Sequence, residues 1–124
     1  MKRAVQLERP TGEPLPIEVT TAAGRRPVVL LNGAPRELSA RLARAGFAVV
    51  AADCRTPDEI GLVLDALKGR ALGFDGDEPV AVLAADQALA RVARERAVPT
   101  LVLSGVVSVE TVETAVQWLR RHLV

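Results

Sequence analysis

The sequence predicts an α/β fold, a three-layer sandwich with a mostly parallel sheet of about six strands and an antiparallel N-terminal hairpin. Four continuous apolar runs, typical of strands covered on both faces, alternate with segments that have the apolar spacing of helices. Such alternation implies right-handed crossovers between parallel strands. With 124 residues, the chain is long enough for one sizeable core but not for two. We therefore expect residues 1–124 to form a single domain.

The first two strands differ from the others. Residues 3–8 and 16–21 each alternate between apolar and polar side chains, and a segment rich in proline and glycine separates them. Proline is tolerated mainly at sheet edges, because it lacks the backbone N–H that a central strand donates. These segments are predicted to be two short antiparallel strands near an edge of the sheet.

The parallel strands are predicted from continuous apolar sequence. Each run ends in a turn or in the start of a helical pattern, as expected of buried strands. The four predicted strands cover residues 27–32, 47–52, 79–84 and 99–105.

The clearest local signal is Thr56-Pro57-Asp58-Glu59. Thr56 can cap a helix, Pro57 suits the first helical position, and Glu59 can reach back to complete a capping box. An apolar stripe follows at helical spacing and stops at Gly69. The segment predicts a helix over about 57–68.

Three further helices are predicted from weaker signals. One opens at Pro35 and ends at Gly46. Another runs from about Asp86 to Arg96, and the last is capped by Ser108 and carries cationic residues in its final turn.

Composition excludes several functional classes. The net charge is +1 and aromatic residues make up 2% of the chain, so neither a basic field nor stacking surfaces favour nucleic acid as a partner. Cys54 is the single cysteine, which predicts no disulfide and no cysteine metal site. No glycine pattern matches a phosphate-binding loop, so no cofactor is expected. The N-terminus lacks the apolar run of a signal peptide and no segment is long enough to span a membrane, so we expect a cytoplasmic protein without a membrane partner.

The order of motifs resembles the α/β-hydrolases. RRPVVLLNGAP is similar to the strand and oxyanion loop of that family, and LARAGFAVVAADCRT to its next helix and strand. GFDGDEPVAVLAADQALA resembles the approach to the nucleophile elbow, and VPTLVLSG the late strand that precedes the catalytic acid. PTGEPLPIEVTTAAG is similar to the N-terminal hairpin of the dienelactone-hydrolase branch. By this comparison the chain is abridged: it lacks one strand–helix unit, the last strand and the histidine loop.

The resemblance places Asp86 at the nucleophile's position, where the family pattern G-x-S-x-G reads Ala84-Ala85-Asp86-Gln87-Ala88. Some relatives, such as haloalkane dehalogenases, use aspartate there. A second interpretation is structural, because aspartate at a helix N-cap contributes about 1 kcal/mol. The only histidine, His122, falls in the last turn of a helix and is interpreted as an exposed cation rather than a catalytic base.

A ligand edge is predicted where the parallel strands end, since open α/β sheets bind ligands there. Cys54 also falls at this edge, either as a catalytic thiol beside Arg55 or as a small buried residue. The other residues expected to line an oxyanion or ligand site there are Asn32, Gly33, Ala34, Gln87 and Ser104.

Two functions are compatible with these observations. The first is a non-catalytic module with an incomplete triad, which binds a small molecule at this edge or self-associates as a homodimer. The strand over 99–105 would then offer an open sheet edge to a second copy. The alternative is an active small hydrolase that acts on esters or lactones.

Overall fold

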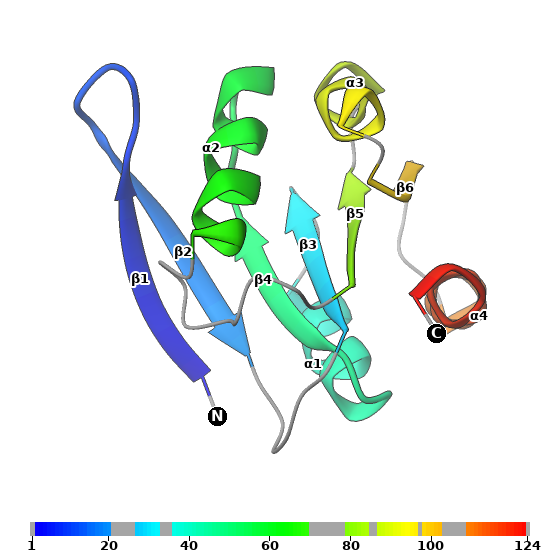
Figure 1. The fold of residues 1–124 in the computed structure, drawn as a ribbon. Helices are drawn as coiled ribbons and strands as arrows, with labels where there is room; N and C mark the ends of the chain where they lie inside the picture. Colours follow the sequence, from blue (N-terminus) through cyan, green and yellow to red (C-terminus); the bar gives the residue numbers. More distant parts are fainter. Residues whose placement is uncertain are drawn as a thin grey trace.

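The computed structural model describes seven segments of the chain: residues 2–20, 27–32, 36–69, 79–84, 87–96, 98–102 and 109–123. Within these segments, six strands form one sheet in the order β1-β2-β4-β3-β5-β6. Helices cover both faces of the sheet (Figure 1). The predicted three-layer α/β architecture with an antiparallel hairpin is confirmed.

The hairpin consists of β1 (Lys2–Glu8) and β2 (Pro14–Thr20), which pair antiparallel along their full length. β2 is not an edge strand, because it also pairs antiparallel with β4 through Ile17–Thr20. Pro14 and Pro16 lie outside that second pairing. The prolines therefore occupy the part of β2 that has a single neighbour, where a missing N–H is tolerated.

The parallel strands follow the predicted runs. Their bounds are β3 (Val28–Asn32), β4 (Ala48–Ala52), β5 (Val80–Ala84) and β6 (Thr100–Val102). β3 pairs with both β4 and β5, and all five of its residues are buried. β6 has three described residues, and the predicted extension over 103–105 lies outside the described part of the chain.

The helices are α1 (Arg36–Arg44), α2 (Pro57–Lys68), α3 (Gln87–Glu95) and α4 (Val109–Leu123). α2 begins and ends where the sequence predicts, and Thr56 and Glu59 form the expected capping box. Pro35, Asp86 and Ser108, the residues predicted to open the other helices, lie outside the described residues.

Two apolar clusters lie on opposite faces of the sheet, because alternate residues of each strand point to opposite sides. The first cluster joins one face of the sheet to α2 and α3: Leu15, Ile17, Val19, Val28, Leu30, Ala48, Val50, Ala52, Cys54, Ile60, Val63, Leu64, Leu67, Val82, Ala84, Ala90 and Ala93. The second cluster lies under α1 and α4: Val29, Leu31, Leu38, Leu42, Phe47, Val49, Ala81, Leu83, Val112, Ala115 and Leu119. Both clusters are almost entirely aliphatic, in keeping with the scarcity of aromatic residues.

Candidate functional site

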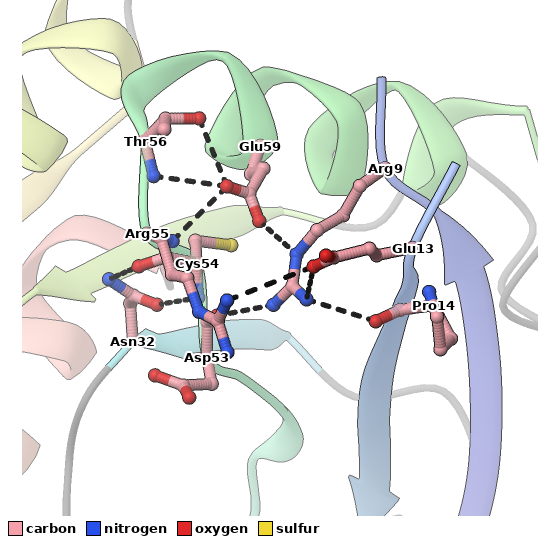
Figure 2. A network of polar contacts seen from close by, with 9 residues as sticks. All are labelled: Arg9, Glu13, Pro14, Asn32, Asp53, Cys54, Arg55, Thr56 and Glu59. Carbon is pink, nitrogen blue, oxygen red and sulfur yellow. Dashed lines mark hydrogen bonds and ion pairs between the residues drawn. The ribbon is translucent and has the colours of Figure 1, made fainter. Parts of the chain in front are cut away.

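The richest set of polar contacts lies at the carboxyl ends of β3 and β4 (Figure 2). The turn between β1 and β2 reaches the same place, because β2 runs antiparallel to β4 and begins beside its end. The N-terminus of α2 completes the site. Three segments far apart in the sequence therefore supply its side chains.

Asn32 ties the ends of β3 and β4 together. Its Oδ1 accepts a 2.7 Å hydrogen bond from the Cys54 backbone N–H, and its Nδ2 donates to the Cys54 carbonyl over 3.4 Å. These bonds continue the strand pairing beyond its last register pair, Asn32 and Ala52. Asn32 is buried, so its amide is committed to holding the two strands together.

Cys54 is buried beneath α2 in the first cluster. Burial, and after it the negative charge of Glu59, raises the pKa of the Cys54 thiol to about 12. Arg9 acts in the opposite direction but does not outweigh these effects. The side chain is therefore a neutral thiol at physiological pH, whereas nucleophilic cysteines require the thiolate.

Arg9 and Glu59 form a buried ion pair at the centre of the site. Arg9 Nε donates to Glu59 Oε1 over 2.5 Å, and the two side chains are only 8% and 4% exposed. The guanidinium also donates to the carbonyl oxygens of Pro14, at 3.0 Å, and of Asp53, at 3.2 Å. Arg9 thus joins the hairpin turn to both β4 and α2.

The second oxygen of Glu59 serves the start of α2. Oε2 accepts hydrogen bonds from the backbone N–H groups of Arg55, at 3.3 Å, and Thr56, at 3.1 Å, and from the Thr56 hydroxyl at 3.0 Å. Burial by itself would raise the pKa of Glu59. The hydrogen bonds from Arg9 and Thr56 and the charge of Arg9 outweigh it, so the pKa of Glu59 is lowered.

Glu13 lies at the solvent-exposed rim of the site. Its carboxylate is 3.9 Å from Arg9 Nη1 and 3.9 Å from Arg55 Nη1. Glu13 and Arg55 are 64% and 66% exposed, so these pairs contribute little to stability. The buried part of the network carries the interaction energy.

Comparison with known proteins shows similarity in structure but not in sequence. No family model and no curated protein matches the chain. A cold-adapted esterase from an Arctic intertidal metagenomic library aligns with a TM-score of 0.61 and 17% identity, over 98% of this chain and 64% of that one. Esterase LipW from Mycobacterium marinum aligns with a TM-score of 0.59 and 22% identity, over 99% of this chain and 54% of that one.

A third similar structure is brefeldin A esterase, a bacterial homologue of human hormone-sensitive lipase. Its TM-score is 0.58 and its identity 20%, over 78% of this chain and 36% of that one. The chain has the α/β-hydrolase fold. It spans between 36% and 64% of the length of these three esterases. The finer resemblance to the dienelactone-hydrolase branch stays a prediction.

Within the α/β-hydrolase fold, the structure brings together two of the residues predicted for the carboxyl edge, Asn32 and Cys54. Gly33, Ala34, Asp86 and Ser104 lie outside the described residues. Gln87 begins α3, but the placement of its side chain also lies outside what the structure describes. The roles predicted for these residues stay predictions.

His122 is exposed near the end of α4, as expected from sequence. Its ring centroid lies 4.5 Å from that of Trp118, with the ring planes tilted by 40°. The contact joins two residues one helical turn apart and involves no acidic side chain, so it gives His122 no orienting partner of the kind a catalytic base needs.

Sequence reasoning missed the two residues that make the most contacts in this site. Glu59 is identified in the sequence only as half of a capping box, and Arg9 is not singled out at all. Nothing local distinguishes Arg9 from an exposed turn residue, because its partner is 50 positions away. The unused signal was the position of Glu59 in the first turn of the helix that follows a buried strand.

The described residues include neither a metal-binding group of side chains nor a membrane-spanning helix. None of their groups of three or more His, Cys, Asp and Glu side chains is arranged to hold a metal ion. No helix among them combines the length and apolarity needed to cross a membrane.

Proposed function

We propose that this chain is a non-catalytic module with the α/β-hydrolase fold, which acts by binding or self-association. One observation carries the proposal. In the described part of the carboxyl edge, the buried polar side chains bond to one another or to the chain's own backbone, and none of their nitrogen or oxygen atoms lacks a hydrogen-bond partner.

A catalytic edge needs free, preorganised groups. Oxyanion stabilisation requires donors aimed at the position where charge develops. The Asn32 amide instead donates to the chain's own Cys54 carbonyl. A nucleophile needs an activating base, yet the Cys54 thiol has a raised pKa and the nearby Glu59 carboxylate is bound to Arg9.

The alternative is an active small hydrolase for esters or lactones. The structural likeness to esterases supports it. Such an enzyme would draw its nucleophile from Asp86, Ser104 or Cys54.

A substrate panel separates these functions. The purified chain is incubated with chromogenic short-chain esters, lactones and haloalkanes, in parallel with Asp86→Asn, Ser104→Ala and Cys54→Ala. Asp58→Asn serves as the matched control, because Asp58 is an exposed carboxylate in the first turn of α2. We expect no turnover above buffer for any chain. Turnover that one of the three site variants abolishes and Asp58→Asn retains would establish a hydrolase and identify its nucleophile.

A further inference from the structure

β1 forms one end of the sheet and leaves a long edge without a described neighbour. Its seven residues pair with β2 in one unbroken register, from Lys2 opposite Thr20 to Glu8 opposite Pro14. Figure 1 shows no described element on the outer side of β1. An edge strand leaves every second residue's N–H and C=O groups unpaired, which is a template for another strand.

All seven residues of β1 are described, and none of them is a proline, so every residue keeps its backbone donor. The strand over 99–105, which the sequence pattern predicts as an open edge, is described only over Thr100–Val102, and its role as an edge stays a prediction.

The charges of β1 are complementary to those of a reversed copy of the same strand. The strand reads KRAVQLE, with Lys2 and Arg3 at its beginning and Glu8 at its end. If a second copy of the strand pairs antiparallel with the first about Val5, each residue lies opposite the residue of the other copy whose number, added to its own, gives ten. Lys2 of each copy then lies opposite Glu8 of the other. Parallel pairing in register would instead align like charges, which is destabilising.

The same register also matches the two faces of the strand. Ala4, Gln6 and Glu8 are exposed, so one face is solvated. Val5 and Leu7 are half-buried against the first cluster. Pairing about Val5 brings the two Val5 residues together and extends the first cluster across the junction, because opposed residues of an antiparallel pair lie on the same face.

We infer that β1 is the docking edge for a second copy of this chain, which pairs antiparallel about Val5 to give a two-fold symmetric dimer with one continuous sheet. The inference rests on the proposed self-associating function and names its partner and surface. A two-fold axis through Val5 makes the contact self-complementary and closed, so it ends at two copies. The charges at the strand ends disfavour other registers, which protects the edge from open-ended pairing.

Charge reversal tests the inference by sedimentation equilibrium of the full chain at neutral pH and low salt. We expect the wild-type chain to dimerise. Lys2→Glu alone and Glu8→Lys alone should each weaken the dimer roughly tenfold or more, because both symmetric pairs become like-charged. An equimolar mixture of the two variants should recover the dimer as a mixed species, because each variant then meets opposite charges. Misfolded variants could not recover in this way.

Glu113→Lys is the matched control, since Glu113 is an exposed glutamate on α4, at the other end of the molecule in Figure 1. It should leave the dimer unchanged. A chain that stays monomeric at every concentration overturns the inference, as does a dimer that Glu8→Lys leaves intact. The substrate panel and the sedimentation experiment test separate claims. Turnover by a dimer would overturn only the non-catalytic function, and a monomer without turnover would overturn only the β1 interface.

Discussion

The carboxylate of Glu59 is buried and ionised, which is costly unless its charge is matched. Arg9 supplies the opposite charge, and the start of α2 supplies three hydrogen-bond donors. Because Arg9 is buried as well, neither residue can lose its partner without leaving a desolvated charge behind.

Removing the negative charge of Glu59 should therefore strongly destabilise the folded chain. We expect Glu59→Gln to lower the free energy of unfolding by about 3–5 kcal/mol, the usual effect of breaking a buried ion pair on one side. Urea denaturation at neutral pH measures it, with Asp58→Asn as the control on the same helical turn. A loss for Glu59→Gln no greater than for Asp58→Asn would contradict the interpretation of the pair.

Acid should weaken the same contact. The pKa of Glu59 in the folded chain lies below its ordinary value of 4.5. A lowered folded pKa gives stability that is fully present above the unfolded pKa and is lost as pH falls through the folded value. Stability should thus decline below about pH 4.5, and Glu59→Gln should show a shallower decline over that range. Parallel acid profiles for the two chains would exclude Glu59 as the source.

The stability that Cys54 contributes should depend on pH in the opposite direction from that of Glu59, because the pKa of Cys54 in the folded chain is raised from 9.0 to about 12. Its contribution to stability is present below pH 9.0 and is lost as pH rises toward 12. We expect a thiol reagent at pH 8 to label the folded chain far more slowly than the urea-unfolded chain. Equally fast labelling of both would mean that the thiol is accessible.

At the residue scale, sequence reasoning located Asn32 and Cys54 because Asn32 ends one buried strand and Cys54 comes two residues after the end of another. It did not find Arg9, whose burial depends on a carboxylate brought near only by the folded sheet. Periodicity and capping rules apply to residues that are close together in the sequence, whereas Arg9 and Glu59 are 50 positions apart.

At the scale of elements, α2 and α3 pack side by side over the first cluster. Arg96, directly after α3, reaches back over α2 and donates to Asp65 at 2.6 Å. A Cβ added at Gly61 would lie 2.9 Å from Arg96 Nη2, so the guanidinium passes over the bare backbone of that glycine. The Arg96 hydrogen bond lowers the pKa of Asp65, and the same pair raises the pKa of Arg96.

Gly61→Ala should move Arg96 and uncouple this pair. Alanine favours a helix over glycine by about 1 kcal/mol, whereas an exposed ion pair contributes about 0–1 kcal/mol, so the net change in stability should be small. We expect Asp65→Asn to destabilise the wild-type chain slightly and to have less effect after Gly61→Ala. A double-mutant cycle by urea denaturation measures the coupling, and strict additivity would contradict it.

The elements also show where sequence patterns stop being sufficient. The continuous apolar runs predicted β3, β4 and β5 to within one residue at each end, because a strand buried on both faces must be apolar throughout. The fourth run predicted the start of β6 to within one residue, and its predicted end lies outside the described residues. The prolines predicted a hairpin near an edge of the sheet, and β1 and β2 are the first two strands in the sheet order; β2 is paired on both sides only over 17–20. Proline restricts single backbone donors rather than whole strands, so Pro14 and Pro16 constrain only their own positions.

At the scale of the whole molecule, the sheet separates two apolar clusters that share its backbone. Leu30 belongs to the first cluster and Leu31 to the second, although they are adjacent in β3. Alternation along β3 therefore couples both layers of helices through one central strand. The layered architecture was predictable because every strand–helix unit repeats the same pattern.

This arrangement predicts a single cooperative transition. Leu30→Ala should lower stability by about 2–5 kcal/mol, as for other buried leucines. Trp118 packs against the second cluster, and its fluorescence should report the same shift in urea midpoint as far-ultraviolet circular dichroism. A Trp118 transition that stays at its wild-type midpoint would mean that the two faces unfold separately.

The bond between Arg9 and Glu59 spans 50 positions, and this separation has a consequence for synthesis of the chain on the ribosome. The hairpin emerges before α2, and the carboxylate that anchors its turn is made only with α2. An isolated two-stranded hairpin is marginal in water. We therefore expect β1 and β2 to remain undocked in the nascent chain until α2 has left the exit tunnel, so that the hairpin settles after segments that are synthesised later than it.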